Sequence, residues 1–152
     1  MSRPDAWILA KWERAGYPAT IRLASAYREM ENVPGYAHRV IVAVELRNPT
    51  EAGQPSADEW DDLKAFELNV CRVLEADNEC LCVLVITGNG LRDIFFYAKN
   101  PGTVRERISG AKKQLKSHRF QLAIEQEVDW RVYRSFAKML ARPTSPETKT
   151  SA

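Results

Sequence analysis

Two apolar runs flank an Asn-Gly pair near the middle of the chain, in the stretch CLCVLVITGNGLRDIFFYAK from Cys80 to Lys99. Asn-Gly between β-rich runs is typical of a β-hairpin with a two-residue type I′ turn. With Asn89 and Gly90 in that turn, Val83 faces Phe96, and the side chains alternate between the two faces of the sheet. One face is almost wholly apolar and is predicted to lie beneath helices: Leu81, Val83, Val85, Ile94 and Phe96. The opposite face is apolar with polar edges and needs a cover, a partner or a ligand: Cys82, Leu84, Phe95 and Tyr97.

Alternation along the chain predicts further strands. Residues 5–13 and 19–28 are expected to pair around a turn at 14–18. The segment from His38 to Leu46 has few polar residues on either side, which is typical of a central strand. Residues 120–127 alternate strictly between apolar and polar positions, which is typical of a half-buried strand.

Apolar residues at spacings of three and four predict helices. The first helix follows a predicted capping box, in which Ser56 accepts from a first-turn amide and Glu59 reaches back. Its apolar positions are Trp60, Leu63, Phe66, Val70 and Leu74. A second helix is predicted after Asn100, and a third is predicted with Asp129 as its N-cap.

From residue 38 to residue 127 the order is strand, helix, strand, strand, helix, strand. This order predicts an α+β fold, a ferredoxin-like βαββαβ sandwich with both helices on one face of the sheet. An N-terminal β-hairpin and a C-terminal helix are additions, available to cover the open face. Residues 1–141 are expected to form a single domain, and the Pro-, Ser- and Thr-containing tail 142–152 is expected to be disordered.

Composition places the chain among proteins of a reducing compartment. A net charge of +2 gives no bulk field that would draw it to nucleic acid or to a membrane surface. Three cysteines, two of them within a predicted strand, indicate free buried thiols rather than a disulfide framework. The N-terminal apolar stretch is too short for a signal peptide. We therefore expect a cytoplasmic protein that does not associate with membranes.

The open face of the sheet invites comparison with RNA-recognition folds, because Phe95 and Tyr97 lie two residues apart on it. The motif around these rings lacks the glycine of that class, and Glu45 and other carboxylates on this face would repel phosphates. Base stacking is therefore not favoured here. Cover by the N-terminal hairpin, or a face-to-face homodimer, is the preferred expectation.

A basic cluster lies along the second helix and the loop that follows it. Six of its residues are cationic and one, Glu106, is acidic. The cations are Arg105, Arg107, Lys112, Lys113, Lys116 and Arg119. The cluster is interpreted as the solvated side of an amphipathic helix, with an acidic partner or a phosphate backbone as the open alternative.

Residues suited to catalysis are few. The histidines are His38 and His118, and His118 is expected to be exposed in a helix-to-strand loop. The chain has no P-loop, no Gly-x-Ser-x-Gly motif and no Cys-x-x-Cys spacing. Four carboxylates near the start of the first helix are explained by its dipole rather than by a metal: Asp58, Glu59, Asp61 and Asp62. We expect a non-enzymatic protein without catalytic residues, metal or cofactor.

A succession of short motifs resembles a known family. In order, they are Gly53-Gln54-Pro55, Glu59, Thr87-Gly88-x-Gly90-x-Arg92, Phe96-Tyr97 and Asp129-Trp130-x-x-Tyr133. This succession is similar to the bacterial family catalogued as domain of unknown function 695. The resemblance implies a ferredoxin-like α+β domain with no established activity. It also implies fusion, in some members, to a domain similar to the regulator of ribonuclease activity B, an inhibitory partner of ribonuclease E. A binding role is therefore favoured.

We accordingly expect a binding or regulatory domain that acts through protein–protein contacts, either as a homodimer or with another protein. The candidate binding surface comprises Glu45, Cys82, Arg92, Phe95, Tyr97, Asp129, Trp130 and Tyr133. Arg92, opposite Thr87, is expected to pair with a carboxylate at the end of the sheet, either to bind a partner or to tie the turn to Asp129 or another acid. The alternative is a small-molecule binder or enzyme with a pocket between the N-terminal hairpin and the sheet. Nucleic-acid binding through residues 105–119 is not favoured.

Overall fold

One six-stranded antiparallel sheet organises the chain in a computed structural model that describes residues 6–141. The strands are β1 (Trp7–Arg14), β2 (Tyr17–Ala24), β3 (His38–Glu45), β4 (Cys80–Gly88), β5 (Leu91–Ala98) and β6 (Phe120–Gln126). The α-helices of the described residues are α1 (Trp60–Glu75), α2 (Pro101–Gly110) and α3 (Arg131–Ala141), and short 3-10 turns follow β2 and α1. The tail predicted to be disordered, 142–152, lies outside the described residues.

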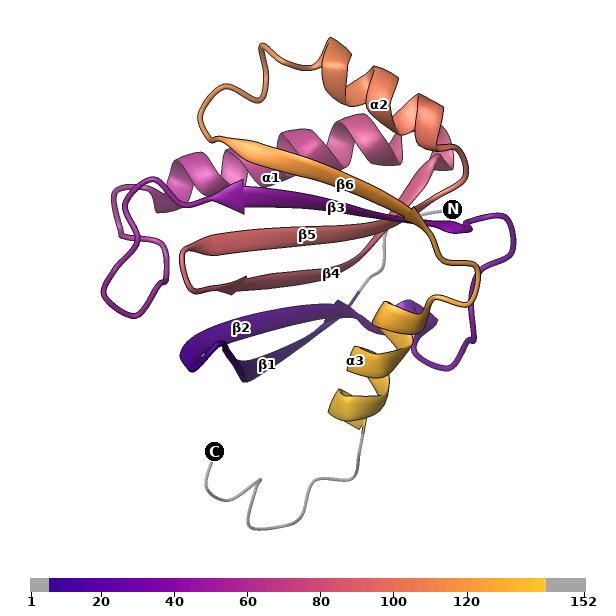
Figure 1. The fold of residues 1–152 in the computed structure, drawn as a ribbon, viewed down its shortest axis with the longest axis horizontal. Coiled ribbons are helices and arrows are strands. Elements are labelled where there is room, and N and C mark those ends of the chain that lie inside the picture. Colours follow the sequence, from indigo (N-terminus) through magenta and orange to yellow (C-terminus); the bar gives the residue numbers. More distant parts are fainter. Residues whose placement is uncertain (1–5, 142–152) are drawn as a thin grey trace.

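The α+β class is confirmed. Elements β3-α1-β4-β5-α2-β6 follow the order of the predicted ferredoxin-like arrangement, and their strands lie in the sheet in the order β6-β3-β5-β4. Figure 1 shows α1 and α2 together on one side of the sheet and α3 apart from them. The sheet therefore separates two layers of the core. Helices α1 and α2 pack on one face of the sheet, and α3 packs on the other.

The N-terminal hairpin had been expected to cover the open face of the sheet. It extends the sheet instead. β2 pairs with β4, so that β1 becomes the outermost strand (Figure 1). This pairing satisfies the backbone amides and carbonyls of β4 that would otherwise form an exposed edge. Cover for the open face comes instead from α3 and from the segment that contains Tyr27 and Tyr36.

The central hairpin has the predicted turn. Asn89 and Gly90 have φ angles of 54° and 82°, as a type I′ turn requires, and Thr87 pairs with Arg92. Further along, the register shifts between Cys82 and Leu84, so that Cys82 rather than Val83 pairs with Phe96.

This bulge changes the faces that had been predicted for the first half of β4. One extra residue in a strand reverses the side on which the preceding residues lie. Cys82 therefore packs in the helix-covered layer with Phe96, while Leu81 and Val83 belong to the opposite layer. The predicted positions of Cys82, Leu81 and Val83 were wrong, and those of Phe95 and Tyr97 were right.

The start of α1 also differs from the prediction. Ser56 donates to the carboxylate of Asp58, and no side chain caps the first turn of the helix. Glu59 instead accepts hydrogen bonds from the backbone of the β3–α1 connection. Four of the five predicted apolar positions are buried, but Trp60 is 45% exposed. The helix α2, in contrast, has the expected cap, because the Asn100 side chain accepts from the amides of Gly102 and Thr103.

Candidate functional site

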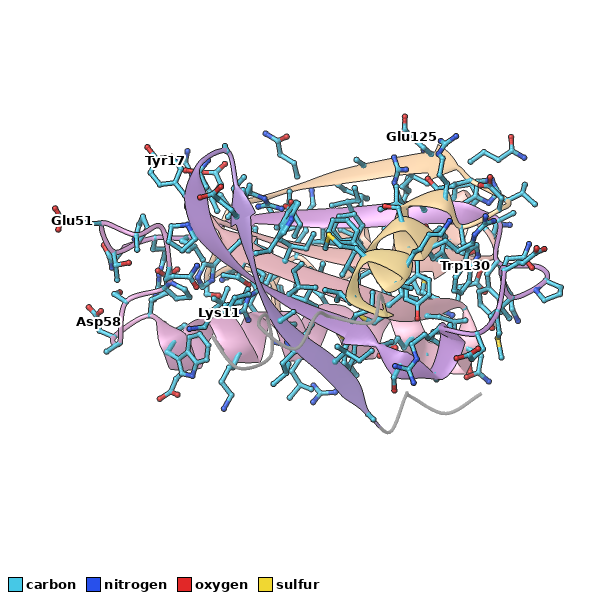
Figure 2. The ribbon with its side chains drawn as sticks, turned by 90° about the horizontal axis from the view of Figure 1, so that it is seen from below. Lys11, Tyr17, Glu51, Asp58, Glu125 and Trp130 are labelled. Atoms are coloured by element: carbon cyan, nitrogen blue, oxygen red, sulfur yellow. The ribbon has the colours of Figure 1, made fainter. Side chains whose placement is uncertain are left out.

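The aromatic residues of the predicted binding surface on the open face are buried in the core of the protein. The ring of Trp130, which is labelled in Figure 2 at the start of α3, stacks on the ring of Tyr97 with centroids 4.2 Å apart. The Trp130 indole donates to the carbonyl of Tyr36, and Tyr133 donates its hydroxyl to the carbonyl of Ala24. These rings are buried and hydrogen-bonded, so they fill the space where a pocket between the hairpin and the sheet had been considered.

Glu127 fixes α3 to this face. Its buried carboxylate accepts from the Tyr97 hydroxyl, from the Val132 amide and from the guanidinium of Arg39. Burial, followed by the hydrogen bond to Glu127, raises the pKa of Tyr97 well above its usual value. The cap of α3 therefore comes from Glu127, which directly follows β6, and the prediction that Asp129 provides it was wrong.

The remaining predicted site residues do not gather around these rings. Phe95 lies in the same buried layer, and Asp129 is exposed at the turn before α3. Glu45 is exposed at the end of β3, whereas Cys82 lies on the other face of the sheet. Cys82 contacts the thiol of Cys71 on α1, and that hydrogen bond together with burial raises the pKa of Cys82.

Arg92 marks a different site, on the helix-covered side. Its Nε donates to the Thr87 hydroxyl at 2.9 Å, and its Nη1 donates to Glu67 on α1 at 2.8 Å. The prediction of a carboxylate partner is confirmed, but that partner is Glu67 and not Asp129. Arg22 on β2 reaches the same carboxylate, with Nη2 lying 2.7 Å from both oxygens of Glu67.

An open cavity of about 400 Å³ surrounds this cluster, between α1 and the N-terminal hairpin. We call it the α1–hairpin groove. Its lining residues are Arg22, Trp60, Lys64, Ala65, Glu67, Leu68, Cys71 and Arg92. A volume of this size is in the range of ligand pockets, roughly 300–1,000 Å³.

The geometry of the sheet explains why the groove exists. Leu9, Arg22 and Val85 pair across β1, β2 and β4, and directly opposed residues share one face. Val85 lies under the helices, so Leu9 and Arg22 face the same side but further out. Leu9 is 73% exposed, which shows that no described element covers this part of the hairpin.

Exposed apolar side chains border the cationic floor of the groove, the name used for its cations Arg22, Lys64 and Arg92. Trp60 and Leu68 are 45% and 47% exposed, and with Lys64 they form a stripe of every fourth residue on α1. The guanidinium carbon of Arg92 lies 5.5 Å from the centroid of the Trp60 ring. Arg22 lies similarly over Trp7, at 5.6 Å. Both distances are those of cation–π contacts.

Burial sets the electrostatics of this floor. The side chain of Arg92 is almost completely enclosed, and desolvation lowers its pKa, while the charge of Glu67 raises it in opposition. A guanidinium stays protonated under such conditions. The groove therefore presents three cations, Arg22, Lys64 and Arg92, against the single carboxylate of Glu67.

A buried pair that the sequence pattern did not predict lies at the same end of the sheet, between the start of α1 and the loop before β6. His118 is buried rather than exposed, and its Nε2 lies 2.6 Å from Glu59 Oε2. Glu59 additionally accepts from the amides of Arg47 and Asn48 at 2.6 and 2.9 Å. Burial by itself would raise the pKa of Glu59, but these hydrogen bonds and that with His118 lower it below its usual value. Asp58, in contrast, points outward before α1 (Figure 2).

Other chemistry is sparse. Within residues 6–141, no group of three or more His, Cys, Asp or Glu side chains is placed to hold a metal ion. In the same part of the chain, none of the helices has both the length and the apolar character needed to span a membrane. The three cysteines are all free and buried.

Several residues that carry the family resemblance meet at one end of the sheet. The Gly53 carbonyl accepts from the Gly90 amide at 2.9 Å, and the Gln54 side chain donates to the carbonyls of Pro18 and Thr87. A methyl group on Gly53 would lie 2.6 Å from the Asn89 nitrogen, so only glycine fits there. No curated protein and no solved structure matches the chain significantly. A model of a family of unknown function, DUF695, matches residues 5–137, and the chain belongs to that family.

Proposed function

We propose that this chain is a non-enzymatic binding domain that acts through protein–protein contacts, and that the α1–hairpin groove receives the partner. The observation that carries this proposal is the pair of exposed apolar side chains, Trp60 and Leu68, that borders the cations of the groove. Large exposed apolar side chains that gather at one concave site are typical of interaction surfaces, and tryptophan and arginine are enriched among the residues that dominate binding energy.

The other surfaces support the proposal less well. The rings on the open face pack within the chain, where they hold α3. In the basic cluster, Arg107 donates to the carbonyls of Val73 and Ala76 at the end of α1. That contact explains Arg107 through the stability of the fold, since cations stabilise helix C-termini. In the groove, by contrast, the exposure of Trp60 and Leu68 is not explained by the stability of the fold.

A cytoplasmic location belongs to the same proposal. Cys71, Cys80 and Cys82 form no disulfide and are buried, although Cys71 and Cys82 are in contact. Thiols in this state are typical of proteins kept in a reducing environment.

Selection from a display library of random peptides on the immobilised protein tests the proposal. We expect enrichment of segments with leucine or aromatic residues next to acidic ones, because these complement the border and the floor. Binding should be lost in the double variant Trp60→Ala/Leu68→Ala. The matched control is Val128→Ala/Met139→Ala, which truncates two exposed apolar residues away from the groove. Failure to enrich any peptide, or equal binding by both double variants, would overturn the proposal.

A further inference from the structure

The cations of the α1–hairpin groove have hydrogen-bonding capacity that the chain does not use. A guanidinium carries five N–H donors. Among residues 6–141, the hydrogen bonds of Arg22 all leave from Nη2, and those of Arg92 leave from Nε and Nη1. The Nε and Nη1 groups of Arg22 and the Nη2 group of Arg92 therefore remain without a protein acceptor in this part of the chain.

The charge of the groove is also incompletely balanced. Glu67 is the one carboxylate among the lining residues, and it already accepts from both guanidinium groups. With Arg22, Lys64 and Arg92 as cations, the lining carries two positive charges in excess. Because Arg92 is buried and Arg22 only partly exposed, solvent and salt screen this excess less than they screen surface charges.

We propose that Arg22, Lys64 and Arg92 bind a phosphate monoester in the α1–hairpin groove, on a phosphorylated segment of a partner protein. A phosphate monoester carries about −1.5 to −2 charges near neutral pH, which matches the excess, whereas one carboxylate would leave a cation uncompensated. Arginine forks also fit the oxygens of phosphate in pairs. The apolar border on α1 favours a peptide as the carrier, because Trp60 and Leu68 would contact the residues that flank the phosphate.

Glu67 has a defined part in this site. Its carboxylate holds the two guanidinium groups side by side in the free protein, and its negative charge opposes the phosphate. Replacement of Glu67 by glutamine keeps the shape of the side chain and removes the repulsion. We therefore expect E67Q to bind phosphate more tightly than the unmodified chain, a result that a purely structural role of the cluster would not produce.

Calorimetric titration with three probes tests the site: inorganic phosphate, a short phosphoserine peptide flanked by leucines, and the same peptide without phosphate. We expect the phosphopeptide to bind most tightly and the unphosphorylated peptide most weakly. R22Q and K64Q should each weaken phosphopeptide binding by roughly tenfold, the effect of one lost charged hydrogen bond. E67Q should strengthen it by a similar factor. Affinity should fall as the pH is lowered through about 6, where the phosphate gains a proton.

The controls make the outcome decisive. Lys64 on α1 and Lys113 in the turn after α2 are both exposed lysines, so K113Q is the matched control and should leave binding unchanged. K64Q removes an exposed side chain, so its result does not depend on the buried cluster folding correctly. No binding of phosphate or phosphopeptide, equal losses in K64Q and K113Q, or weaker binding by E67Q would each overturn the inference.

The inference rests on the proposed function for its choice of a protein as the carrier, and the probes separate the two. If inorganic phosphate and the phosphopeptide bind equally well, the phosphate site stands and the contact with a protein partner fails. If library peptides without phosphate bind the groove and phosphate does not compete with them, the proposed function stands and the phosphate site fails.

Discussion

His118 and Glu59 form a buried pair, 2.6 Å apart between Nε2 and Oε2, that joins the start of α1 to the loop before β6. The Oγ of Ser117 lies 2.8 Å from the other ring nitrogen of His118. Because its hydrogen bonds favour the ionised form of the Glu59 carboxylate, Nε2 of His118 is the donor in this pair. This arrangement connects segments that are far apart in the sequence, at the end of the sheet where β3 ends and β6 begins.

Replacing Glu59 by glutamine should lower the free energy of unfolding by about 2–3 kcal/mol, because buried donors lose a charged acceptor. Urea denaturation measures this change. Asp58→Asn, at the adjacent exposed position, is the matched control and should change the free energy by no more than about 0.5 kcal/mol. Equal effects of the two substitutions would contradict the structural role of the pair.

The same carboxylate should make the protein sensitive to acid. The pKa of Glu59 is lower in the folded chain than its usual 4.5, so the folded state favours the ionised form. Its contribution to stability is complete above about pH 4.5 and is lost as the pH falls through the folded-state pKa. The urea midpoint of the unmodified chain should therefore drop more steeply below this pH than that of E59Q. Parallel pH profiles would show that Glu59 is not the group responsible.

Arg39 contacts two carboxylates that should differ greatly in importance. Glu127 is buried and also holds the Tyr97 hydroxyl and the Val132 amide, whereas the Glu125 side chain is 69% exposed and points outward (Figure 2). Glu127→Gln should destabilise the fold by about 3 kcal/mol, because it removes the buried charged acceptor that the Tyr97 hydroxyl, the Val132 amide and Arg39 share. Glu125→Gln should cost at most about 1 kcal/mol. Urea denaturation followed by tryptophan fluorescence reports both effects, and comparable losses would contradict the proposed anchoring of α3.

Comparison of Gly53 with Gly16 distinguishes the two reasons for which a position requires glycine, a positive φ angle and a lack of space for a side chain. Both have positive φ angles, 82° and 83°, but a methyl group on Gly16 would meet open space, whereas one on Gly53 would collide with Asn89. Gly16→Ala should therefore cost only the backbone strain, about 1 kcal/mol. Gly53→Ala should cost about 3 kcal/mol or more, since the loop must also move away from the turn. Thermal unfolding of the two variants measures the difference, and equal melting temperatures would show that the loop does not rest on the turn.

The pattern of neighbouring residues in the sequence predicted those parts of the fold that depend on interactions between neighbouring residues. The alternation along β3 and β6 and the type I′ turn at Asn89-Gly90 follow from neighbouring residues and are present as expected. The bulge in β4 could not be found in this way, because the run CLCVLVI is apolar at every position and its alternation carries no information. The face of Cys82 was consequently assigned wrongly.

The residues of the α1–hairpin groove were not predicted from the sequence for a related reason. Trp60 begins the apolar stripe of α1 in the sequence, but the stripe at Leu63, Phe66 and Val70 turns toward the sheet and leaves Trp60 at the border. Its spacing of four to Lys64 and Leu68 was the available signal. The burial of His118 and the convergence of Arg22 on Glu67 depend on partners distant in sequence, which no local pattern reports.

The buried thiols should resist alkylation as long as the chain is folded. Burial raises the pKa of Cys80 to about 12, from a usual 9.0, and Cys82 is raised by its contact with Cys71 and by burial. Since the thiolate is the reactive form, a shift of this size lowers the reactive fraction of Cys80 roughly a thousandfold at neutral pH. Iodoacetamide followed by peptide mass spectrometry should therefore modify Cys80 and Cys82 in urea but not in the native protein. Rapid native labelling of either residue would mean that the strand β4 opens, and would contradict its placement at the centre of both layers of the core.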